Sequence, residues 1–504
     1  MEVRRNSVVR TLAASAMQIS AVLAGLMLGT ACSRTPSDPA TLNSALTSAL
    51  TVSGFRSTAS TMTFSIVDVA GRPVPHAKIM IGPRENVPFP GNVLRADDKG
   101  VLVTPTDWTD SQPVTIEAAG FVRATYFGAT PDKANFVLRR AVAFQKVELK
   151  GLTTGFGQLK TDGFLDVGLV FPAISKAEVA TLNIANLISP EVDHMTVLGQ
   201  DLTIPSNVTF PDQNESYIFP IRFNKPQYRS YQAETGDYKF LALHGRLPFR
   251  QTVDDLRAGK SFFEIINTID FREGSVNSLT LSQPTQTSNL AVNGGSFAKT
   301  LSFTAPAYDA GNIVLAAAIS EDQGLFFPTD LKNVAAGANV MLATPQTATP
   351  KLILASLRAK NLPTNGSSSE FTSSVVLPAN SSQAFDFLPQ LKAPSLNNQV
   401  LNIDVPQAPA SVAPVMTYAV LNKIELIKNG DIKVERKTPQ WDVYAPAWSQ
   451  QMELPMFPSN EPGTLERLRW EVGFGGIQVG QEAPAVGPLA VEKLTHLTRS
   501  ALDL

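Results

Sequence analysis

Short runs in which apolar and polar residues alternate are the main pattern of this chain from about residue 62 onward. Thr63–Asp68 alternates in this way, and the runs at 77–81, 101–104, 114–118 and 135–138 are similar. Turn residues such as Ala70-Gly71 and Lys99-Gly100 lie between them. Alternation with a period of two, bounded by turn residues, predicts β-strands.

The same pattern continues through the rest of the chain. It predicts strands at 163–171, 202–210, 217–221, 238–243, 300–304 and 312–319. Two capping boxes, Ser175 with Glu178 and Ser261 with Glu264, predict short helices, the first ending at about residue 187. The tail at 489–504 fits either a strand or a short helix.

A hairpin is expected in the last part of the chain. Asn429-Gly430 stands between the apolar runs 423–427 and 432–435, and this dipeptide favours the type I′ turn that matches strand twist. Trp470 alternates with Leu468, Val472 and Phe474, so these side chains should share one face of a strand.

The N-terminus has the pattern of a secretory signal. Arg4, Arg5 and Arg10 precede an uncharged apolar segment at 12–28. This segment is shorter than the ~20 residues that span a bilayer, and no cluster of Lys or Arg follows it. We therefore expect residues 1–31 to be a signal peptide and the Ser/Thr/Pro-rich residues 32–60 to be a tether.

Cys32 is the only cysteine of the chain and directly follows this segment. The sequence Leu28-Gly-Thr-Ala-Cys32 resembles the lipobox of bacterial lipoproteins, although Gly29 stands where the family usually has Leu. The resemblance implies that Cys32 is lipidated and anchors the protein to a membrane, and Ser33 implies the outer membrane. An ordinary cleavage site with an incidental cysteine is the alternative.

A second resemblance concerns residues 61–141. Val67-Asp68, Gly71-Arg-Pro-Val74, Asp97-Asp-Lys-Gly100 and Ala119-Gly-Phe121 resemble the carboxypeptidase regulatory-like module, which is a transthyretin-like or carbohydrate-binding-like β-sandwich. Ala96 departs from the Thr that the module often has. The resemblance implies a fold and no active site.

The predicted fold class is mainly β, with several β-sandwich domains in series and a few short helices. A chain of 504 residues is too long for one hydrophobic core. After the signal and the tether we expect a module at 61–141, a β-rich domain with short helices at 142–281, an immunoglobulin-like domain at 282–395 and a C-terminal β domain at 396–504.

Composition excludes some classes of function. The net charge is −2, with 17% charged residues, so the chain has no basic field for nucleic acid. A single cysteine excludes an intramolecular disulfide.

The sequence shows no familiar catalytic or metal-binding motif. None of the four histidines, His76, His194, His244 and His496, begins a His-x-x-Glu or His-Glu-x-x-His motif of zinc peptidases. Gly259-Lys-Ser261 lacks the first glycine of a phosphate-binding loop, because residue 254 is Asp. Asp97 and Asp98 fit a turn better than a calcium site. We therefore expect no metal, no cofactor and no enzymatic activity.

The aromatic residues Trp441, Tyr444 and Trp448 are the candidate binding patch. They fit either a sandwich core, which we favour, or a platform on which sugar rings stack. The overall expectation is a lipid-anchored envelope protein with a structural or binding role, whose partner is an envelope protein or a glycan. A carbohydrate-binding lipoprotein is the main alternative, and an uncharacterised envelope hydrolase that uses a Ser and a His is less favoured.

Overall fold

A computed structural model provides the structure of the chain. It describes residues 62–133, 135–141, 147–157, 162–175, 192–197, 200–211, 227–232, 235–258, 267–308, 311–322, 325–346, 351–358, 373–376, 386–429, 432–458 and 467–504. This part is mainly β with two short helices, which confirms the predicted fold class. No helix in it has the length and apolar character needed to cross a membrane. The predicted signal, Cys32 and the tether lie outside these residues.

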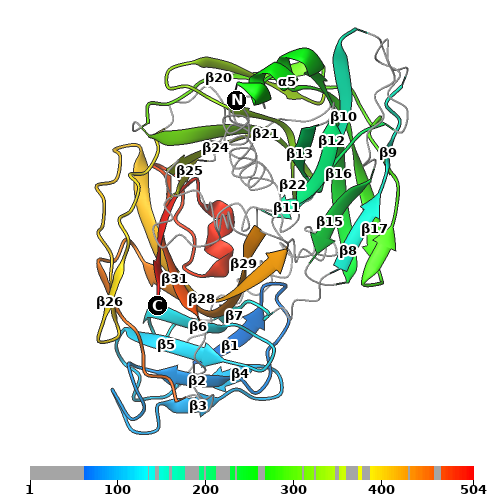
Figure 1. Cartoon of the computed structure of the whole chain (residues 1–504). Helices are drawn as coiled ribbons and strands as arrows, with labels where there is room; N and C mark the ends of the chain where they lie inside the picture. Colours follow the sequence, from blue (N-terminus) through cyan, green and yellow to red (C-terminus); the bar gives the residue numbers. More distant parts are fainter. Residues whose placement is uncertain are drawn as a thin grey trace, which may run out of the picture.

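One sheet of thirteen strands runs through most of the molecule (Figure 1). In spatial order it consists of β11 (Ile174–Ser175), β22 (Leu325–Asn333), β21 (Asn312–Asp322), β24 (Lys351–Arg358), β25 (Ser373–Val376), β32 (His496–Asp503), β31 (Leu468–Gln478), β28 (Val412–Asn429), β29 (Ile432–Pro446), β6 (Arg123–Ala129), β5 (Gln112–Glu117), β2 (Lys78–Ile81) and β3 (Val93–Arg95).

The first segment, within residues 62–141, is a two-layered β structure. Its second layer consists of β4 (Val101–Val103), β1 (Thr63–Asp68) and β7 (Asn135–Leu138). The buried rings of Phe64 and Phe136 pack edge to face at 5.3 Å, and Phe136 makes the same contact with Tyr126 of β6 at 5.2 Å. The strands predicted at 63–68, 77–81, 101–104, 114–118 and 135–138 are confirmed to within two residues.

This segment joins the C-terminal strands directly. Residues 123–126 of β6 pair in parallel with residues 441–444 of β29, and Figure 1 shows the blue and cyan strands below the orange ones. The Arg139 guanidinium donates a hydrogen bond to the buried carboxylate of Asp442 at 3.0 Å. The first and last expected domains therefore share one sheet.

The second segment, within residues 147–291, contains four smaller sheets. They are β14 (Val208–Thr209), β10 (Phe164–Pro172), β16 (Gly236–Pro248) and β17 (Asp270–Leu281); β15 (Tyr228–Gln232), β8 (Val147–Gly151) and β18 (Thr285–Thr287); β19 (Leu290–Ala291) and β9 (Thr153–Thr154); and β12 (Val192–Val197) and β13 (Gln200–Pro205). Strands β18 and β19 lie beyond the expected boundary at 281/282, yet they pair with β8 and β9. The second unit thus extends past that boundary.

The third segment, within residues 299–358, packs a two-stranded sheet against the large one. β20 (Lys299–Thr304) pairs with β23 (Asn339–Thr344), and their apolar side chains meet those of β21 and β24 in a separate core. β25 then pairs with β32, so the expected boundary at 395/396 also lies within a shared sheet.

The C-terminal segment contains the predicted hairpin. β28 and β29 pair antiparallel as far as Asn429 against Ile432, and the connecting residues 430–431 lie outside the described part. Trp470, Val472 and Phe474 share one core, as predicted. The tail adopts both of the predicted alternatives in turn, the 3₁₀ helix η2 (Pro488–Lys493) and then β32. A small sheet of β26 (Ser395–Asn397), β27 (Val400–Asn402) and β30 (Gln451–Glu453) completes the unit.

The helices predicted at 176–187 and 261–266 and the strand predicted at 217–221 lie outside the described residues. The described residues include the α-helix α5 (Phe249–Arg257), which was not predicted. It directly follows β16 and precedes the capping box read at Ser261.

The ion pair between the half-buried Arg139 and the buried Asp442, next to the pairing of β6 with β29, should be a large contributor to stability. Asp442→Asn leaves the Arg139 guanidinium without its carboxylate, so the free energy of unfolding should fall by about 2 to 4 kcal/mol in chemical denaturation. Asp404→Asn is the control, because that carboxylate is exposed and pairs with an exposed Lys392. It should cost no more than ~0.5 kcal/mol. Equal effects of the two substitutions would contradict this role of Asp442.

Candidate functional site

His244 lies in the middle of the four-stranded sheet, on β16 between β10 and β17. Alternate residues of β16 point to opposite faces. Leu241 and Leu243 face the main core, whereas Phe240, Ala242 and His244 face a second, smaller core. His244 is buried next to the apolar residues of this smaller core, so its polar ring nitrogens need hydrogen-bond partners.

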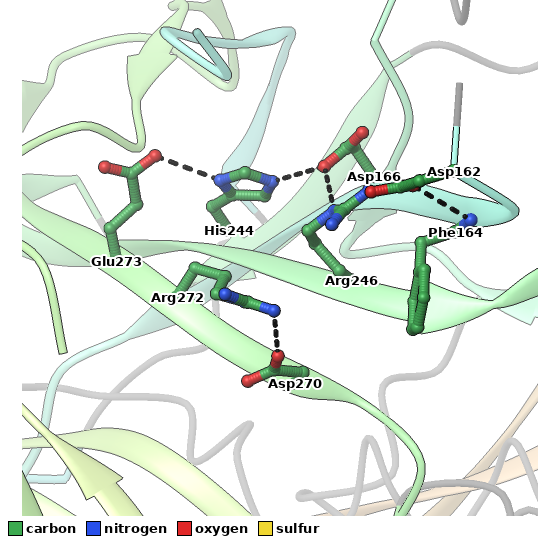
Figure 2. Close-up of polar contacts among 8 residues, drawn as sticks. All are labelled: Asp162, Phe164, Asp166, His244, Arg246, Asp270, Arg272 and Glu273. Atoms are coloured by element: carbon green, nitrogen blue, oxygen red, sulfur yellow. Dashed lines mark hydrogen bonds and ion pairs between the residues drawn. The ribbon is translucent and has the colours of Figure 1, made fainter. Parts of the chain in front are cut away.

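The partners of His244 are two carboxylates from the neighbouring strands (Figure 2). Its Nε2 lies 2.8 Å from Oδ1 of Asp166 on β10, and its Nδ1 lies 3.0 Å from Oε1 of Glu273 on β17. The imidazole therefore bridges three strands. Phe156 packs edge to face against the ring at 5.1 Å.

Arg246, two residues along β16, extends the cluster. Its Nε donates to Oδ1 of Asp166 at 3.1 Å, and its Nη2 donates to Asp162. The guanidinium also lies 5.0 Å from the centre of the Phe164 ring. Asp166 thus accepts hydrogen bonds from both the imidazole and the guanidinium, as Figure 2 shows.

The electrostatics of the cluster favour a charged imidazole. Burial alone would lower the pKa of His244, but the hydrogen bonds and negative charges of Asp166 and Glu273 outweigh burial, and the pKa is raised. The hydrogen bond from Arg246 lowers the pKa of Asp162. Both ring nitrogens lie within hydrogen-bond distance of carboxylate oxygens, so the geometry fits an imidazolium and a guanidinium held by carboxylates.

This arrangement gives His244 little capacity for base catalysis. A general base needs a free nitrogen lone pair within reach of a substrate proton, whereas both nitrogens of His244 are engaged by carboxylates. Within the described residues, no Ser or Thr hydroxyl forms a hydrogen bond with this ring, and no group of three or more His, Cys, Asp or Glu is placed to hold a metal ion. The geometry fits an ionic link between strands.

The other histidines do not join this cluster. His76 is exposed at a turn and lies 3.2 Å from the exposed carboxylate of Asp98. His194 belongs to β12, whose side chains lie outside the described part. His496 is buried, and burial lowers its pKa to about 4. Its Nδ1 is 2.8 Å from the Thr495 hydroxyl.

The structure separates the three aromatic residues of the expected binding patch. Tyr444 is buried on the face of β29 that meets the main core, 5.4 Å from Tyr126. Trp441 and Trp448 are half-buried and pack on the other face, against the core that contains Trp470. The three side chains therefore do not form one platform.

Both tryptophans donate their indole N–H groups within the protein. Trp441 Nε1 donates to Oγ1 of Thr125 at 2.9 Å, and Trp448 Nε1 donates to the carbonyl of Gly475 at 2.9 Å. The Trp448 ring stacks on Phe474 at 5.2 Å. These contacts fit the structural interpretation of the two rings, although part of each ring is exposed.

A second buried ionic cluster lies on the large sheet. Lys437 of β29 pairs with Glu471 of β31, and Arg499 of β32 lies 3.6 Å from the same carboxylate. Burial lowers the pKa of Lys437 to about 8. Burial opposes the charge of Glu471, but Lys437 and Arg499 outweigh it and lower the Glu471 pKa. This cluster also links three strands.

Sequence reasoning did not find either cluster. The partners of His244 are 78 and 29 positions away along the chain, a separation that no local motif covers. One signal was available, because Asp166 interrupts the apolar run at 163–171 and a carboxylate inside a buried strand requires a partner.

Comparison with known proteins adds no relationship: no protein-family model matches this chain, and no curated protein matches it.

Trp448→Ala separates the structural and the sugar-binding interpretations of the half-buried rings. If the ring serves packing, the free energy of unfolding should fall by about 2 to 4 kcal/mol, because the stack on Phe474 and the bond to Gly475 are lost. Trp448→Phe keeps the stack and should cost clearly less. Unchanged thermal unfolding of Trp448→Ala, together with loss of binding on a glycan array, would instead support the sugar-binding interpretation.

Proposed function

We propose that this protein is a lipid-anchored component of a bacterial cell envelope with a structural or binding role. The observation that carries the proposal is the lone Cys32 behind the apolar segment at 12–28, in the sequence Leu28-Gly-Thr-Ala-Cys32. A cysteine lipidated on sulfur at this position would carry two or three acyl chains on one residue and would hold the protein at a membrane. Ser33 favours the outer membrane.

The β-rich part of the chain supports a structural role. Its buried charged groups at His244, Asp442 and Glu471 are engaged in pairs that tie strands together. Such groups stabilise a defined arrangement of strands and leave little chemistry available for a substrate. The partner is a protein or a glycan of the envelope.

Carbohydrate binding is the second candidate function. It is favoured by the partial exposure of Trp441 and Trp448, since the faces of tryptophan rings stack on sugars. The guanidinium of Arg123 lies 5.5 Å from the centre of the Trp441 ring, so one side of that ring is already covered by the protein. Trp448 is therefore the better residue for a test of this candidate.

Replacement of the thiol tests the anchor. The wild type should incorporate labelled palmitate and partition into the detergent phase, whereas Cys32→Ser should lose the label and appear in the aqueous phase. Ser37→Ala, a change of similar size in the tether, should behave like the wild type. A wild type that incorporates no palmitate and partitions into the aqueous phase would show that the proposed lipid anchor is wrong.

A further inference from the structure

The double hydrogen bond of His244 depends on its protonation state. A neutral imidazole carries one N–H group and can donate to only one carboxylate, whereas an imidazolium donates from both nitrogens. The contacts to Asp166 at 2.8 Å and to Glu273 at 3.0 Å therefore need the charged form. When the proton leaves, one contact becomes a repulsion between two lone pairs.

The charged groups at the ring and next to it come from all three strands of the cluster. They are Asp162 just before β10, Asp166 on β10, Arg246 on β16, and Asp270, Arg272 and Glu273 on β17. Asp270 and Arg272 are half-exposed and pair with each other. The two carboxylates that contact the ring, Asp166 and Glu273, favour the proton, and the Arg246 guanidinium contacts Asp166 rather than the ring. The remaining neighbour, Phe156, is neutral.

We propose that His244 is a proton-dependent clamp that holds β17 to the rest of its sheet. β17 is the outer strand of the four-stranded sheet, and its pairing with β16 shifts register beside His244. The side-chain bridge from Glu273 to His244 fastens the strand at this irregular place. Loss of the proton releases the bridge and loosens β17.

The contact that opens is the one to Glu273. Asp166 is 5% exposed and is also held by Arg246, so it retains the N–H of the neutral ring. Glu273 is 26% exposed and can turn toward water. The clamp therefore releases the outer strand, while β10 and β16 stay joined.

The direction of the pH effect follows from linkage. The pKa of His244 in the folded protein is raised above the ordinary value of 6.5. The contribution to stability is thus complete below pH 6.5 and is lost as the pH rises through the folded pKa. Mildly acidic conditions should tighten β17, and alkaline conditions should loosen it.

Hydrogen exchange of the full chain between pH 6 and 9 tests the clamp. After correction for the intrinsic rate, opening of the segment 270–281 should increase about tenfold across this range. Glu273→Gln should abolish the increase, because a carboxamide can accept from the imidazolium and donate to the neutral ring. His244→Gln should abolish it as well.

Two controls make the result specific. His76→Gln removes an exposed histidine and should leave the tenfold increase intact. The segment 412–429 of β28 should show no matching increase, because a parallel rise there would mean global unfolding. A flat wild-type profile for 270–281, or a Glu273→Gln variant that keeps the wild-type increase, would overturn the proposal.

Discussion

The parallel pairing of β6 with β29 is the interaction on which the rest of the structure depends. It joins the first segment to strands that follow it by more than three hundred positions. The ion pair between Arg139 and Asp442 of β29 is a second link between the same two parts of the chain. Tyr126 and Tyr444 then lie on the same face of the sheet, in a core that also holds Leu243 of the second segment and Leu315 of the third. The four expected domains are therefore joined through one apolar core and one long sheet.

The buried charges follow a common rule in this architecture. His244, Asp442 and Glu471 each lie on a strand inside the protein, and each pairs with opposite charges from other parts of the fold: His244 with Asp166 of β10, Asp442 with Arg139 just after β7, and Glu471 with Lys437 of β29. A charge without such a partner would cost several kcal/mol to bury. The pairs thus favour one arrangement of strands over others that would bury the same apolar residues but separate the charges.

Local features of the fold could be predicted from the sequence, and distant ones could not. The strand at 63–68 and the hairpin next to Asn429 depend on alternation and turn residues, which lie within a few positions of each other. The pairing of β6 with β29 joins residues 318 positions apart, such as Arg123 and Trp441, and leaves no local pattern. For the same reason the pairing of β18 with β8 and of β19 with β9, across the expected boundary at 281/282, left no local pattern.

The candidate site shows the same limit. The residues next to His244 in sequence do not indicate its partners, because Asp166 and Glu273 lie on neighbouring strands. The aromatic trio was predicted from proximity in sequence, but the alternation of β29 sends Tyr444 to the face opposite Trp441. Side chains an even number of positions apart on a strand share a face, whereas those an odd number apart lie on opposite faces, however close they are in sequence.

Denaturant-dependent hydrogen exchange of the wild-type chain tests most directly whether the first segment and the C-terminal strands form one cooperative structure. The two segments to compare are 112–129, which contains β5 and β6, and 412–429, which is β28. A continuous sheet and core predict that both segments lose protection at the same denaturant concentration. Separate midpoints, with one segment still protected after the other has opened, would contradict the account.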